Sequence, residues 1–140
     1  MPYTWVPTIS QGYWQNGVLV GVGEVLNEID CILQKGTFNS KGQLHGNNCI
    51  AIDYSDLSLV TIKKGTFSNG LENGTVYEYV FPKSRWATLI GNGTISTTKY
   101  TRTYNLGALT ATTQTQTNFN IAGGFAYTDK FESCGFDEIV

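Results

Sequence analysis

His45 and Cys49 are the residue types that most directly suggest catalysis, because a histidine beside a cysteine can activate its thiol for nucleophilic attack. His45 is the only histidine of the chain. Four residues of extended strand span about 13 Å, since each residue advances about 3.3 Å. The two side chains would therefore meet only if the chain turned at residues 46–48. The sequence suggests no carboxylate to orient the imidazole, so we expect His45 to be a surface residue.

Paired carboxylates could supply the acid and the base of a glycosidase. Acidic residues near turns are usually solvated, however, and nothing in the sequence forces these inward. The candidates are Glu24 with Glu28 and Asp30, Asp53 with Asp56, and Glu72 with Glu78. We therefore expect the protein not to be an enzyme.

Two further motifs fall short of a binding site. The run Gly21–Glu24 lacks the third glycine of a phosphate-binding loop. The cysteines Cys31, Cys49 and Cys134 contain no CxxC pair, so a zinc or redox motif is unsupported and we expect reduced thiols. The sequence therefore predicts no metal and no cofactor.

Charge and hydropathy exclude several classes of protein. The chain has 140 residues, with 9 Lys and Arg against 11 Asp and Glu, and lacks the basic surface of a nucleic-acid binder. The chain contains no apolar run of about 18 residues, so the sequence predicts no membrane-spanning helix. The first residues have no basic or apolar signal region, which favours a cytoplasmic or virion location. With 41% hydrophobic residues, the chain can form one folded domain over residues 1–140.

The composition is that of an all-β protein, because Thr, Tyr, Val and Ile dominate and Asn and Gly punctuate them. Residues 97–104 alternate between two faces. One face carries Thr97, Lys99, Thr101 and Thr103, and the other carries Thr98, Tyr100, Arg102 and Tyr104. Apolar residues between 22 and 33 also fit a helical stripe. Gly21 and Gly23 are unfavourable at a helix start, so we predict strands there.

A repeated pattern occupies residues 11–93. Each copy has a glycine, one residue, an aromatic residue, a short polar turn ending in glycine, three residues and a further glycine. The copies begin at Gly12, Gly36 and Gly65, and an incomplete fourth copy runs over residues 85–93. Because glycine accepts positive φ, such turns close β-hairpins, and successive hairpins must stack to bury their apolar faces. The structural turn glycines are Gly17, Gly42 and Gly70.

The first copy, from Gly12-Tyr13-Trp14 through Gly17 to Gly21 and Gly23, resembles the MORN repeat (membrane occupation and recognition nexus). The later copies depart from it, because Asn48 and Val76 replace the last glycine. The resemblance implies a single-layer antiparallel sheet of hairpins, and a role in protein–protein contacts and scaffolding, with lipid contact in some members. It brings no catalytic residues.

The repeat aromatics form a candidate binding row. Rings at equivalent positions should line one face of the sheet, where they could hold a sugar, a peptide or a partner surface. The alternative is that they form the core, since a repeat needs a repeated apolar layer. The residues concerned are Trp14, Phe38, Phe67 and Trp86.

Residues 94–140 form a Thr-rich β region with an acidic tail, which we expect to continue or cover the hairpin sheet. Ten threonines lie between Thr94 and Thr117, and only Lys99 and Arg102 are charged between residues 87 and 128. Exposed strand edges normally carry charged residues or proline. Because both are scarce in this segment, we expect its edges to be covered, by protein partners or by self-association. We expect a structural protein acting through β-sheet surfaces in an assembly such as a virus or phage particle. A carbohydrate-binding module and a cellular MORN-type scaffold are the alternatives.

Overall fold

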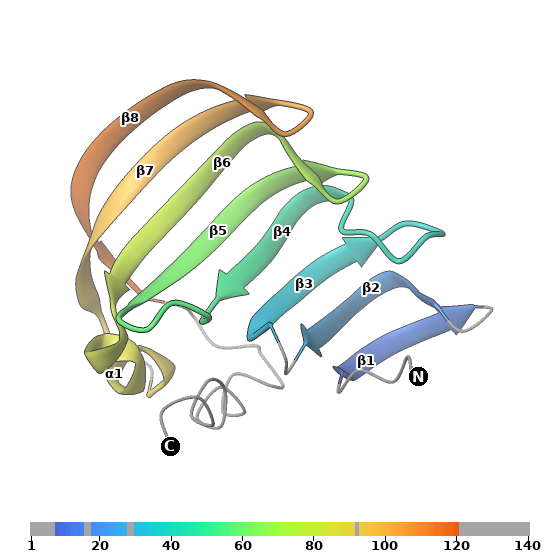
Figure 1. The fold of residues 1–140 in the computed structure, drawn as a ribbon, viewed down its shortest axis with the longest axis horizontal. Coiled ribbons are helices and arrows are strands. Elements are labelled where there is room, and N and C mark those ends of the chain that lie inside the picture. The colour runs from blue at the N-terminus through green and yellow to red at the C-terminus, as the bar shows by residue number, and fades with distance from the viewer. Residues whose placement is uncertain (1–7, 16–17, 28–29, 92, 121–140) are drawn as a thin grey trace.

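The protein is all-β. The computed structural model describes residues 8–15, 18–27, 30–91 and 93–120, with side chains from Val20 onward. One antiparallel sheet contains eight strands in chain order, with β1 and β8 at its two edges (Figure 1). The strands are β1 Thr8–Gln15, β2 Val18–Asn27, β3 Ile32–Phe38, β4 Gly46–Asp53, β5 Leu59–Ser68, β6 Leu71–Pro82, β7 Ile95–Asn105 and β8 Ala108–Phe119.

The strands predicted between residues 22 and 33 are confirmed. β2 continues to Asn27 and β3 begins at Ile32, so the apolar stripe in this segment belongs to two neighbouring strands and not to one helix. Leu26 lies directly opposite Leu33, and both side chains are fully buried. The helical spacing is a coincidence of two period-two patterns on either side of a turn.

Two hairpin turns have the geometry that their sequences require. Asn69 and Gly70 join β5 to β6 with φ of 49° and 86°, while Leu106 and Gly107 join β7 to β8 with φ of 47° and 89°. Positive φ at both central residues is the conformation of a type I′ turn, whose twist matches that of paired strands. Asn-Gly favours this turn, whereas leucine rarely adopts positive φ. The amide of Leu106 donates to Asn73 Oδ1 at 3.0 Å, which helps to hold the turn.

The glycine that lies four residues after the turn glycine has positive φ in each of the three repeat copies. Gly21, Gly46 and Gly74 have φ of 72°, 120° and 83°. In the first and third copies the strand pairing also shifts just inside the hairpin, after Gly12 and after Gly65. Equivalent glycines therefore serve the same local purpose, which is to let one strand bulge against the other.

Hydrogen bonds join the turn of one hairpin to the turn of the next. Asn69 donates its amide to His45 Nδ1 at 3.0 Å and accepts from the side chain of Asn39 at 2.9 Å. The amide of Gly70 donates to the carbonyl of Leu44 at 2.8 Å. His45 is exposed, and its imidazole accepts a hydrogen bond in a contact that aligns two neighbouring hairpins.

A short helical segment lies between β6 and β7. It comprises the 3-10 helix η1, Lys83–Arg85, and the helix α1, Trp86–Ile90. Here the expectation of a fourth hairpin copy was wrong. Trp86, Leu89 and Ile90 follow helical spacing, and both Trp86 and Leu89 are buried against the sheet.

The sheet has two faces, which we call the helix face, against which α1 packs, and the outer face. Strands β5 to β8 bend over α1 (Figure 1). The main core lies on the helix face. Its buried members are Leu26, Cys31, Leu33, Ile52, Val60, Ile62, Phe81, Trp86, Leu89, Ile95 and Phe119. A smaller cluster on the outer face contains Phe38, Leu44, Cys49 and Phe67.

Candidate functional site

The described members of the predicted aromatic row are buried. Phe38 is 3% exposed and Phe67 is 5% exposed, and both belong to the small cluster on the outer face. Trp86 is buried on the helix face, so it does not extend this row. The side chain of Trp14 lies outside the described residues. Phe38 and Phe67 therefore occupy core sites, which the repeat's need for an apolar layer explains. Trp86 is buried separately, as part of α1.

Two of the three predicted turn glycines lie within the described residues. Gly42 and Gly70 lie in the turns after β3 and β5, with φ of 77° and 86°. Gly17 lies outside the described residues.

Asp53, Asp56, Glu72 and Glu78 each contact a partner other than the second carboxylate of their suggested pair. Asp53 accepts from the amide of Ser55 at 2.9 Å, and Asp56 accepts from the amide of Ser58 at 2.8 Å. These contacts close the loop between β4 and β5. Glu72 binds Lys63 and Glu78 binds Arg102, and Glu28 lies outside the described residues. The expectation that these acids are solvated was wrong for Glu24 and Glu78, which are 5% and 3% exposed.

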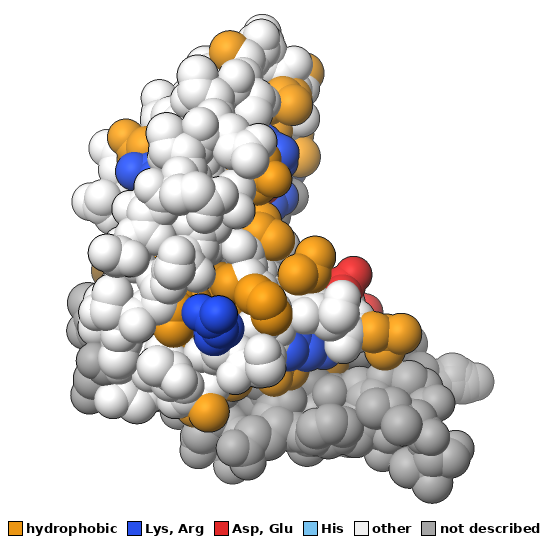
Figure 2. Space-filling view, turned by 90° about the vertical axis from the view of Figure 1, so that its left-hand side faces the viewer, with side chains coloured by type: hydrophobic (Ala, Val, Ile, Leu, Met, Phe, Trp, Pro, Cys, Tyr) orange, Lys and Arg blue, Asp and Glu red, His pale blue; other side chains and the backbone are white. Residues whose placement is uncertain are grey.

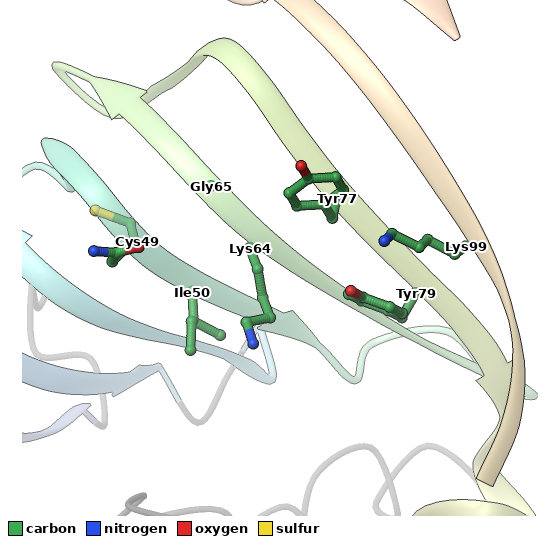
Figure 3. A pocket seen from close by; sticks show the side chains of 8 residues that line it. Cys49, Ile50, Lys64, Gly65, Tyr77, Tyr79 and Lys99 are labelled. Atoms are coloured by element: carbon green, nitrogen blue, oxygen red, sulfur yellow. The ribbon is translucent and has the colours of Figure 1, made fainter. Parts of the chain in front are cut away.

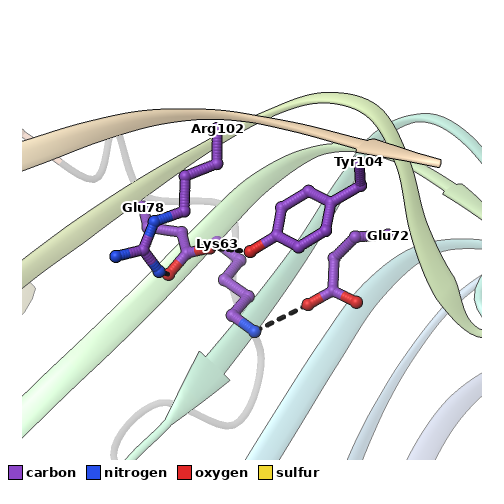
Figure 4. Close-up of polar contacts among 5 residues, drawn as sticks. All are labelled: Lys63, Glu72, Glu78, Arg102 and Tyr104. Carbon is purple, nitrogen blue, oxygen red and sulfur yellow. Dashed lines mark hydrogen bonds and ion pairs between the residues drawn. The ribbon is translucent and has the colours of Figure 1, made fainter. Parts of the chain in front are cut away.

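A charged network crosses the outer face of β5, β6 and β7 (Figure 4). Glu78 is 3% exposed, and its two carboxylate oxygens accept from Arg102 Nη1 at 2.9 Å and from the Tyr104 hydroxyl at 2.6 Å. Lys63 Nζ donates to Glu72 Oε2 at 2.7 Å beside this pair. Burial and the hydrogen bond to Glu78 raise the pKa of Tyr104, which keeps its hydroxyl protonated as a donor. This network ties three strands together.

The Lys63–Glu72 pair makes the stability of the fold fall at acid pH. Burial opposes ionisation of Glu72, but the Lys63 ammonium outweighs it and holds the carboxyl pKa below its ordinary value of 4.5. Because the folded pKa is depressed, the pair contributes stability above about pH 4.5 that is lost as the pH falls through the folded pKa. We expect Glu72→Gln to flatten the acid limb of a plot of melting temperature against pH, measured by circular dichroism, and an unchanged limb would contradict this assignment.

Cys31 and Cys49 are buried, and no disulfide joins them. Burial raises the pKa of the Cys49 thiol above its ordinary value of 9.0. The thiol donates a hydrogen bond to the carbonyl oxygen of Gly46, 3.4 Å from Sγ. A protonated, buried thiol is a poor nucleophile. The Cys49 thiol is therefore a packing group, in the outer-face cluster with Phe38, Leu44 and Phe67.

A hollow of about 610 Å³ opens on the helix face between β4 and β7 (Figure 3). Tyr77 and Tyr79 point into it from β6, Lys99 from β7 and Lys64 from β5. The Lys99 ammonium lies 4.5 Å from the centre of the Tyr77 ring and 5.9 Å from that of Tyr79. Lys64 Nζ lies 5.7 Å from the ring centre of Phe119. The hollow therefore combines two cations with aromatic rings.

Sequence reasoning did not single out these residues. Lys63 and Lys64 are adjacent, yet strand alternation sends Lys63 to the outer face and Lys64 to the helix face, opposite Tyr77. Lys99 meets Tyr79 only through the register of β6 with β7. The Tyr-Glu-Tyr run at residues 77–79 could have indicated part of the hollow, because alternation along a strand places both tyrosine rings on one face.

β8 is a long edge strand of the described sheet. It pairs with β7 on one side, no described strand pairs with its other side, and every residue from Ala108 to Gln116 is exposed. Pairing with β7 is regular from Ala111 to Phe119. Figure 2 looks onto the side of the molecule that carries β8, where white surface predominates over charged side chains. The strand itself, ALTATTQTQTNF, contains no charge and no proline.

Comparison of the chain with protein-family models, curated proteins and solved structures finds no match. Among the described residues, no helix has the length and apolar character needed to cross a membrane. The same residues do not gather three or more His, Cys, Asp or Glu side chains into a group that could hold a metal ion.

Proposed function

We propose that the protein is a non-catalytic structural protein that assembles through its β-sheet edge, with β8 pairing to a second copy of the chain. The observation that carries the proposal is the length of this uncharged, exposed edge. An edge strand presents a row of unpaired amide and carbonyl groups, which another strand can satisfy. A virus or phage particle, or a cellular scaffold, would be a suitable setting.

The side chains of β8 suit such pairing. Natural monomers protect their edges with lysine, proline, short strands or bulges. β8 has a pairing shift only near its turn, opposite Thr103 and Tyr104, and its remaining residues from Ala111 are regular. Since none of its residues is charged, antiparallel pairing with a second copy places no like charges opposite one another in any register. Threonine is also favourable in strands.

Light scattering coupled to size-exclusion chromatography tests this proposal. We expect the wild-type chain to form species whose mass is a multiple of 15.4 kDa and rises with concentration. The double variant Thr113→Lys with Gln114→Lys places one charge on each face of β8, and it should remain a 15.4 kDa monomer at the same concentrations.

The matched control is Ser96→Lys with Thr103→Lys. These residues are exposed on opposite faces of β7, whose two sides are already paired, so the control adds the same charge without changing the edge. It should assemble like the wild type. A wild-type chain that stays monomeric at every concentration, or an edge variant that assembles normally, would overturn the proposal.

A further inference from the structure

We propose that the hollow lined by Lys64, Lys99, Tyr77 and Tyr79 binds a carboxylate-bearing sugar, such as a uronic acid unit of a glycan. The hollow lies on the helix face, and its lining comes from three strands, β5, β6 and β7, together with β4 (Figure 3). Its volume of about 610 Å³ is within the usual range of small-ligand sites. The site is distinct from the β8 edge.

Among the described residues that line the hollow, Lys64 and Lys99 are charged and none is a carboxylate. The ion pairs Lys63–Glu72 and Arg102–Glu78 lie on the outer face. Within the described chain, Lys64 and Lys99 contact aromatic rings and no acid. Two ammonium groups in this setting favour an anionic ligand.

The remaining lining suits a sugar. Tyr77 is 39% exposed, and within the described chain neither its hydroxyl nor that of Tyr79 makes a hydrogen bond to protein. Burial, aided by Tyr77, raises the pKa of Tyr79, so its phenol remains a donor at neutral pH. Rings and neutral hydroxyls match the faces and hydroxyl groups of a sugar, while the lysines match its carboxylate.

Isothermal titration calorimetry with tri-galacturonic acid tests this assignment on the full chain. Maltotriose, a neutral trisaccharide, and a hexaglutamate peptide serve as the comparison ligands. We expect tri-galacturonic acid to bind, and each of Lys64→Gln and Lys99→Gln to raise its Kd about tenfold or more. Lys63→Gln is the matched control, because the same change one residue away faces the outer side, and it should leave the Kd within about twofold.

Circular dichroism of each variant establishes that it is folded, so that a loss of affinity reports on the hollow. No binding of tri-galacturonic acid to the folded wild-type chain would overturn the proposal. Equal affinity for maltotriose would remove the role of the lysines. Tighter binding of hexaglutamate would show that the hollow prefers an acidic peptide to a sugar. Because none of these results depends on assembly, a failure here is distinguishable from a failure of the edge proposal.

Discussion

Replacing Glu78 with alanine will lower the free energy of unfolding by about 3–5 kcal/mol, the range found when one partner of a buried ion pair is removed. Glu78 is 3% exposed, and both of its carboxylate oxygens are occupied, by Arg102 and by Tyr104. Alanine leaves the Arg102 guanidinium without its counter-charge and the Tyr104 hydroxyl without its acceptor. Since domains are typically stable by only about 5–15 kcal/mol, this loss is large.

Urea unfolding followed by circular dichroism measures the effect. The control is Glu72→Ala, which breaks the neighbouring Lys63–Glu72 pair. Its side chains are 32% and 19% exposed, against 28% and 4% for Arg102 and Glu78, so we expect a loss of only about 0–1 kcal/mol. If Glu78→Ala and Glu72→Ala destabilise the chain equally, the outer-face network does not hold the strands as described.

Replacing Gly65 with alanine should lower the free energy of unfolding by roughly 1–3 kcal/mol or more, because the added methyl group overlaps the backbone of β6. A Cβ atom at this position would lie 2.5 Å from the carbonyl oxygen of Thr75 and 2.8 Å from Cα of Val76. Backbone atoms in a paired strand cannot rotate away as a side chain can. The strands must therefore separate where β5 and β6 change register.

Gly74→Ala separates this steric effect from backbone strain. A Cβ at Gly74 meets nothing within 4 Å, but the residue has φ of 83°. We expect a loss of about 1–2 kcal/mol from the left-handed conformation alone, and less for Gly74→Asn, since asparagine tolerates that region. Urea unfolding of the three variants checks the comparison. A Gly65→Ala variant as stable as the wild type would contradict the close approach of β5 and β6.

The hairpin architecture could be predicted from local sequence because turn chemistry is local. Asn69-Gly70 adopts the positive φ values that its residue types favour, and the alternation of residues 97–104 matches the faces of β7. The helix α1 could not be recognised in the same way. It has only five residues, which is too short for a helical hydrophobic period to be recognised. Trp86 also stands where a repeat copy would have its aromatic residue.

The candidate sites depended on information that sequence alone does not contain. The uncharged threonine-rich segment predicted strand edges covered by other parts of the chain or by other subunits, and in the described sheet β8 is an edge strand. The hollow required the register of three strands, because Lys64, Tyr77 and Lys99 are distant in sequence and meet only across the sheet. The aromatic repeat positions could equally have been core or surface, and their burial at Phe38 and Phe67 was settled by packing.

Amide hydrogen exchange of β8 across a concentration series tests whether the chain assembles through this edge. If β8 pairs with a second copy, the amides of residues 111–119 that point away from β7 will exchange rapidly in dilute solution and become protected as the chain assembles. Amides of β5, which is paired on both sides, should change little and serve as an internal reference. Rapid exchange of the outward amides of β8 at every concentration, including those at which the chain is assembled, would contradict assembly through this edge.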